Sequence, residues 1–89
     1  MANHPSAEKR NRQRLRKAER NKGVRSAVRS AVKKARAAIA SGDATSAKNE
    51  VRTAVRALAR AVSKGVVHTK AASRTTSRIE SALNRIARG

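Results

Sequence analysis

The sequence predicts an all-α fold: a three-helix bundle whose first helix is long and protrudes beyond the other two. Apolar residues recur at the three- and four-residue spacing of amphipathic helices in three stretches of the chain. Gly42-Asp43 and Gly65 separate these stretches, and a glycine just after the last apolar residue is typical of a helix C-terminus. We therefore expect a single domain over residues 1–89, with helices at about 6–41, 43–64 and 69–87.

The first expected helix starts with Ser6, a suitable N-cap after Pro5, and continues to Ser41. Its second half carries one apolar stripe, which consists of Val24, Val28, Ala31, Val32, Ala35, Ala38 and Ile39. The first half, from Ser6 to about Gly23, differs because Leu15 is its only large apolar residue. Since this half has no apolar face to bury, we expect it to extend beyond the bundle.

The second and third helices have stripes of the same kind. Asp43 is the expected N-cap of the second helix, which ends at Lys64, and its stripe consists of Ala47, Val51, Ala54, Val55, Leu58, Ala61 and Val62. His68 or Thr69 is expected to cap the third helix, whose stripe consists of Ala72, Thr75 or Thr76, Ile79, Leu83 and Ile86. Because the stripes are narrow and rich in alanine, the three helices can approach closely around one thin core.

The charge of the chain is its most unusual property. It has 23 Lys and Arg against 5 Asp and Glu, a formal net charge of +18 at pH 7, and neither cysteine nor aromatic residues. Self-repulsion of this size opposes compaction, and a bound polyanion relieves it. Nucleic acid is the obvious polyanion, because each neutralised phosphate also releases counterions. Residues 9–36 contain 13 basic residues and one acid, so we expect the first helix to be the main anion-binding element.

The sequence offers no catalytic, metal or cofactor site. His4 and His68 have no second His, Cys or carboxylate at the spacing of a metal site or a catalytic triad. We expect His68 to have a capping or packing role, and we expect no enzyme activity, no cofactor and no small-molecule substrate. No apolar run is long enough for a signal peptide or a membrane span, so we also expect a cytoplasmic protein that does not enter a membrane.

Composition leaves more than one binding partner open. Without aromatic residues the chain lacks the base-stacking surfaces of common single-strand binders, whereas Arg and hydroxyl contacts to a folded RNA backbone remain available. The third helix is rich in hydroxyl residues, which fit either such contacts or an ordinary solvent-exposed face. We therefore expect an RNA-binding protein, and a nucleoid-type DNA-binding protein is the main alternative. A membrane-active peptide is disfavoured because the apolar faces lack Trp, Phe and a broad Leu surface.

A series of short segments also carries a family resemblance. These segments are Met1-Ala2-Asn3, Ser6-Ala7, Lys9-Arg10, Arg20-Asn21-Lys22, Arg25-Ser26, Arg29, Lys33-Lys34, Ala38-Ile39, Gly42-Asp43, Lys64-Gly65-Val66-Val67-His68, Arg74 and Ser77-Arg78. In this order and spacing, over nearly the full length of the chain, they resemble the bacterial small-subunit ribosomal protein S20 family. The chain departs from that family at Glu8, where a Lys is usual, at Thr69-Lys70-Ala71, where Lys-Asn-Lys follows the His, and at Thr75 and Thr76, which replace basic residues.

The resemblance implies a bundle with an extended first helix that binds small-subunit ribosomal RNA directly, helps to organise it during assembly, and lies in the ribosome beside neighbouring ribosomal proteins. The departures imply that the third helix binds RNA less tightly than in other members of the family. Together with the charge pattern, the resemblance predicts the RNA-binding residues Ser6, Lys9, Arg10, Arg14, Lys17, Arg20, Asn21, Arg25, Ser26, Arg29, Lys33, Lys34, Lys64, His68, Lys70, Arg74, Ser77 and Arg78.

Overall fold

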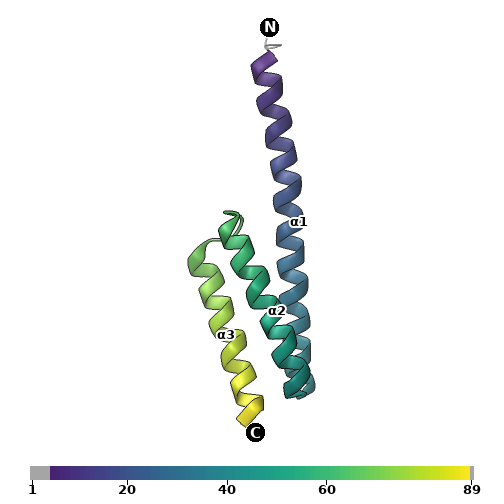
Figure 1. The fold of residues 1–89 in the computed structure, drawn as a ribbon, viewed down its shortest axis with the longest axis vertical. Helices are drawn as coiled ribbons and strands as arrows, with labels where there is room; N and C mark the ends of the chain where they lie inside the picture. The colour runs from purple at the N-terminus through teal and green to yellow at the C-terminus, as the bar shows by residue number, and fades with distance from the viewer. Residues whose placement is uncertain (1–4, 89) are drawn as a thin grey trace.

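The computed structural model describes residues 5–88, without the Pro5 side chain, so His4 and the Met1-Ala2-Asn3 segment lie outside the described residues. The described residues form three helices and no strand: α1 (Pro5–Ser41), α2 (Ala44–Ser63) and α3 (Thr69–Arg88). With 37 residues, α1 is almost twice as long as the 20-residue helices α2 and α3. In Figure 1, α2 and α3 lie beside the second half of α1 only. The all-α bundle with a protruding first helix is therefore confirmed.

The helix ends differ from expectation at the start of α1 and at the end of α2, whereas the predicted N-cap of α2 is confirmed. The prediction that Ser6 caps α1 is wrong, because the helix already begins at Pro5. Proline is favoured at the first helical position, where its fixed φ suits the helix and no N–H is needed. Asp43 precedes α2 as its N-cap: its backbone is extended, and its side chain accepts hydrogen bonds from the backbone N–H groups of Thr45 (3.2 Å) and Ser46 (3.3 Å). The helix α2 ends at Ser63, so Lys64, which was predicted as its last residue, is instead its C-cap.

Both interhelical turns depend on glycines with a left-handed backbone. Gly42 has φ +80 and Gly65 has φ +74. At Gly65 the chain forms a Schellman motif, in which the Gly65 N–H donates to the Val62 carbonyl and the Val66 N–H donates to the Ala61 carbonyl, both at 2.9 Å. These bonds satisfy the carbonyls at the end of α2, and they direct the chain back along the bundle.

Alanine at Gly65 should destabilise the protein, whereas alanine at Gly23 should stabilise it. A left-handed alanine costs about 1 kcal/mol, which lowers the Tm of a domain of this size by about 4–8 °C. Gly23 lies inside α1, its φ is not positive, and no atom lies within 4 Å of an added Cβ. Helix propensity therefore favours alanine there by up to about 1 kcal/mol. Thermal unfolding followed by far-ultraviolet circular dichroism measures both shifts, and equal Tm values for Gly65→Ala and the parent would contradict this role of the turn.

The core is thin and made largely of alanine. Its buried residues are Val32, Ala35, Ala47, Val51, Ala54, Leu58, Ala61, Ala72 and Ile79. Ile79 is the largest fully buried side chain, and no polar residue is buried within the described part of the chain. All nine buried positions belong to the predicted apolar stripes, so the predicted periodicity is confirmed. Because alanine side chains are small, α1 packs closely on α2. The contact between α1 and α3 is much less extensive.

The first part of α1 stands clear of the bundle. Of residues 6–23, which we call the arm, all but Asn21 are exposed, and the Leu15 side chain is 58% exposed. The molecule is accordingly 67 Å long but only 20 × 15 Å across. Within residues 5–88, no helix has an apolar stretch that is long enough to cross a membrane. The arm is thus a single helix that presents its side chains to whatever lies beside the bundle.

Candidate nucleic-acid interface

One face of the arm continues the face that α1 packs against the bundle. Eighteen residues make about five turns of an α-helix, so each arm residue points in the same direction as the residue eighteen places later. The apolar positions Val28, Ala31, Val32, Ala35, Ala38 and Ile39 thus align with Arg10, Gln13, Arg14, Lys17, Arg20 and Asn21. The same stripe is apolar in the bundle and basic or amidic in the arm. We call its four basic residues, Arg10, Arg14, Lys17 and Arg20, the inner stripe.

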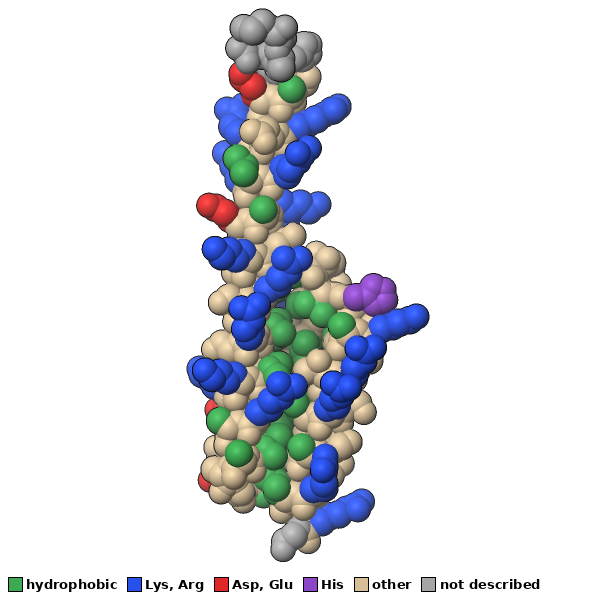
Figure 2. Space-filling model, turned by 180° about the vertical axis from the view of Figure 1, so that it is seen from behind, with side chains coloured by type: hydrophobic (Ala, Val, Ile, Leu, Met, Phe, Trp, Pro, Cys, Tyr) green, Lys and Arg blue, Asp and Glu red, His purple; other side chains and the backbone are tan. Residues whose placement is uncertain are grey.

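The inner stripe faces the side of α1 on which the bundle lies. Asn21 supports this direction, because it is the one half-buried residue of the arm and it aligns with Ile39 of the core cluster. The two acids of the arm, Glu8 and Glu19, align with the exposed Ser26 and Ala37 and so point away from the bundle. Figure 2 shows these acidic side chains at the outer edge of the arm. The inner stripe therefore overhangs the end of the bundle and forms a basic corner with it.

The turn between α2 and α3 supplies the other side of this corner. It lies beside α1 where the arm leaves the bundle (Figure 1), and its residues Lys64 and His68 are exposed, as is Lys70 in the first turn of α3. His68 also has a structural role, because its Nδ1 atom accepts a hydrogen bond from the Lys70 backbone N–H at 3.1 Å. Of the two caps predicted for α3, His68 and Thr69, His68 is therefore the cap, because the helix already includes Thr69. In a neutral His68 ring, the proton then lies on Nε2, which is the ring atom left to contact a ligand.

The residues predicted to bind RNA fall into three groups. All of them except Asn21 are exposed. One group lies on the arm, a second on the bundle half of α1, and a third on the α2–α3 turn and α3; the second group is Arg25, Ser26, Arg29, Lys33 and Lys34, and the third is Lys64, His68, Lys70, Arg74, Ser77 and Arg78. Two residues of the second group, Arg29 and Lys33, line a groove on the bundle.

This groove lies between α1 and α3, and we call it the α1–α3 groove. Its volume is about 520 Å³, and it is lined by Val28, Arg29, Val32, Lys33, Arg36, Leu58, Val67, Ala71 and Thr75. Figure 2 shows hydrophobic side chains along a hollow, with Lys and Arg side chains on both sides of it. Arg36 was not among the predicted site residues. Its spacing of three from Lys33 places both on one helix face, and this signal was available in the sequence.

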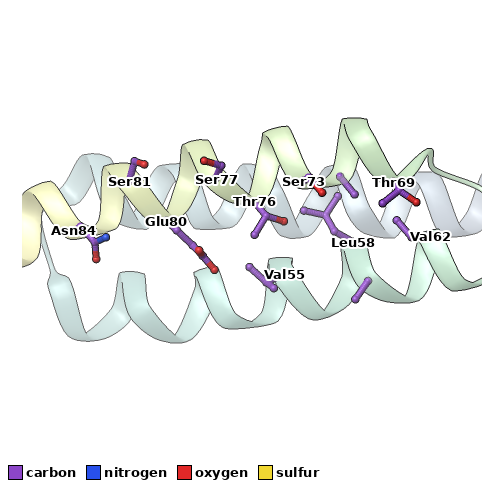
Figure 3. Close-up of a pocket in the computed structure, with 12 residues that line it drawn as sticks. Val55, Leu58, Val62, Thr69, Ser73, Thr76, Ser77, Glu80, Ser81 and Asn84 are labelled. Carbon is purple, nitrogen blue, oxygen red and sulfur yellow. The ribbon is translucent and has the colours of Figure 1, made fainter.

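A second groove, between α2 and α3, has a different chemistry. Its lining is rich in hydroxyls and contains one acid but no Lys or Arg; it consists of Val55, Leu58, Ala59, Val62, Thr69, Ala72, Ser73, Thr76, Ser77, Glu80, Ser81 and Asn84. Figure 3 shows Thr76 and Glu80 pointing toward α2, whereas Ser77 and Ser81 point away from it. Because of Glu80, this groove is less suited to an anion than the α1–α3 groove.

A match to a known protein family includes almost all of the residues that form these surfaces. Residues 2–84 match the profile of the family described as Ribosomal protein S20, a span that includes the arm, α2 and most of α3. None of the curated proteins matches the chain. The family match agrees with the basic surfaces and with the resemblance noted in the sequence. The chain belongs to the ribosomal protein S20 family, and it is a non-enzymatic, RNA-binding structural protein of the small ribosomal subunit.

Proposed function

We propose that the protein binds small-subunit ribosomal RNA directly and stabilises the fold of that RNA while the subunit assembles in the cytoplasm. The inner stripe is the observation that carries this proposal. At these positions, in phase with the buried stripe of the bundle, the arm has Arg10, Arg14, Lys17 and Arg20 instead of apolar residues. A row of exposed cations that overhangs further basic residues is suited to a phosphate backbone lying in the corner.

The shape of the molecule suggests how it would stabilise folded RNA. The arm is about 27 Å long at about 1.5 Å per residue, which is enough to lie between two RNA segments. Phosphates that approach from both sides would otherwise repel each other, and the arm places Lys and Arg between them. Arginine, which supplies three of the four inner-stripe residues, also forms forked hydrogen bonds to phosphate oxygens.

The other proposed contacts extend from this corner. Lys9 and Ser6 would contact the same RNA near the start of the arm, and Arg25, Ser26 and Lys34 would contact it along α1; Lys64, His68, Lys70, Arg74, Ser77 and Arg78 would contact it from the turn and α3. Neighbouring ribosomal proteins are further proposed partners, and the α2–α3 groove, with its hydroxyls and Glu80, is better suited to a protein surface than to RNA.

Binding to small-subunit ribosomal RNA should depend steeply on salt. If about 6–10 phosphates are engaged, affinity should fall by about 10³–10⁵ between 50 and 200 mM salt. Titration of the full chain against a small-subunit ribosomal RNA transcript at several salt concentrations measures this slope, and duplex DNA of equal nucleotide content serves as competitor. We expect the protein to remain bound to the RNA in the presence of the duplex DNA. Displacement by DNA at equal salt would instead favour the nucleoid-type alternative, and a flat salt response would rule out phosphate neutralisation.

A further inference from the structure

The α1–α3 groove combines an apolar floor with two basic rims. Val32 and Leu58 form the deepest part and are 9% and 4% exposed, whereas Val28, Val67 and Thr75 are half-buried and Ala71 is exposed. Arg29, Lys33 and Arg36 form the rim on α1. On α3, Arg74 and Arg78 lie on the same side of the helix as Ala71 and Thr75, because each follows one of them by three residues. A ligand in the groove would therefore meet apolar atoms below it and cations on either side.

The charges around the groove select an anionic ligand. None of the five acids of the chain lines it: Glu8 and Glu19 lie on the arm, Asp43 caps α2, Glu50 lies on α2 and Glu80 lines the other groove. The α1–α3 groove and the α2–α3 groove thus differ in the charge of their lining residues as well as in position. An anion with an apolar part fits the α1–α3 groove and is disfavoured in the α2–α3 groove.

The apolar floor further narrows the choice of ligand. A paired RNA helix presents mainly phosphates and ribose hydroxyls, which gain little from a valine and leucine surface. An unpaired nucleotide also presents the faces of its base, which are apolar and stack on Arg guanidinium planes. No aromatic side chain is present to bind a base elsewhere on the protein.

We infer that the α1–α3 groove binds an unpaired nucleotide of the ribosomal RNA, with its base on the Val32 and Leu58 floor and its flanking phosphates on the two basic rims. This inference rests on the proposed function and adds to it a site with preference for unpaired over paired RNA. The arm would supply affinity that is largely independent of sequence, and the groove would fix the register of the protein on the RNA.

Two alanine-to-leucine exchanges test the groove without changing any charge. Ala71 lines the α1–α3 groove and Ala59 lines the α2–α3 groove, and both are exposed on helices. Ala71→Leu should lower the affinity for a small-subunit ribosomal RNA transcript about tenfold and leave the salt slope unchanged, because a base contact is lost but no phosphate contact. Ala59→Leu should bind like the parent. Chemical probing of the complexes should show a few unpaired nucleotides that the parent and Ala59→Leu protect and that Ala71→Leu leaves reactive.

The outcomes separate this inference from the proposed function. Unchanged affinity and protection in Ala71→Leu, together with weakened binding when the inner stripe is neutralised, would overturn the groove site but leave direct RNA binding intact. Absence of RNA binding by the parent would overturn both. Loss of a neighbouring protein from reconstituted subunits, with unchanged RNA protection, would assign the groove to a protein and so also overturn the inference. Arg36→Gln is a second variant for the case that Ala71→Leu does not fold. It adds no volume to the groove, and it should leave the same nucleotides reactive to the chemical probe.

Discussion

Neutralising the inner stripe should weaken RNA binding far more than neutralising the rest of the arm. The first variant replaces Arg10, Arg14, Lys17 and Arg20 with glutamine, and the matched control replaces Lys9, Arg12, Arg16 and Lys22. Both variants lose four positive charges from the same segment of α1. Glutamine has nearly the helix propensity of Lys and Arg, so the arm should remain helical in both. The two variants differ in the face of the arm helix on which the positive charges are removed.

The expected difference follows from the number of phosphates that each face contacts. Each lost phosphate contact reduces the salt slope by about 1, so the inner-stripe variant should lose about 4 from the slope and about 10²- to 10³-fold in affinity near 0.15 M salt. The control should lose about 1 from the slope, through the proposed contact of Lys9, and about tenfold in affinity, through that contact and the weaker general field of the chain. Fluorescence anisotropy with a labelled small-subunit ribosomal RNA transcript gives both quantities. Equal losses in the two variants would show that net charge, rather than the direction of the stripe, determines binding.

The elements of the fold could be predicted because each is determined by local chemistry. The stripe of α1, from Val24 to Ile39, has the spacing of one helix face, and Gly65 followed by two valines suits a Schellman turn. The start of α1 was predicted wrongly for an equally local reason. Ser6 is a good N-cap and Pro5 a good first helical residue, and the two roles exclude each other. The structure assigns the helix start to Pro5.

The candidate site was predictable only where it lies on a single helix. The inner stripe follows from the periodicity of α1, since Lys17 and Ala35 are eighteen residues apart. The α1–α3 groove could not be predicted in this way, because Arg36 and Thr75 come together only through the packing of both helices on α2. Residues that are adjacent in the sequence can also lie on different faces of the bundle. Ser77 lines the α2–α3 groove, whereas Arg78, rotated by about 100° around the helix, does not line it.

The thin core should make the free bundle depend on a single isoleucine. Ile79 is 2% exposed and is the largest fully buried side chain, while five of the nine buried residues are alanine. Ile79→Ala should therefore lower the free energy of unfolding by about 2–5 kcal/mol, which is much of the stability of a domain this small. Ile86, seven residues later on the same face of α3, is half-buried, so Ile86→Ala should cost clearly less. Thermal unfolding of the two variants without RNA measures this difference.

Bound RNA should restore the fold that Ile79→Ala loses. A ligand that binds only the folded chain stabilises it by about 2.7 kcal/mol at a free concentration of one hundred times its Kd, which is comparable to the loss. Amide hydrogen exchange in α2 and α3 should therefore be fast in free Ile79→Ala and slow in its complex with the ribosomal RNA transcript, while Ile86→Ala should be protected in both states. Rapid exchange that persists in the saturated complex would mean that the arm binds RNA without the bundle. In that case the corner between arm and bundle would have no part in binding, since α1 alone would account for it.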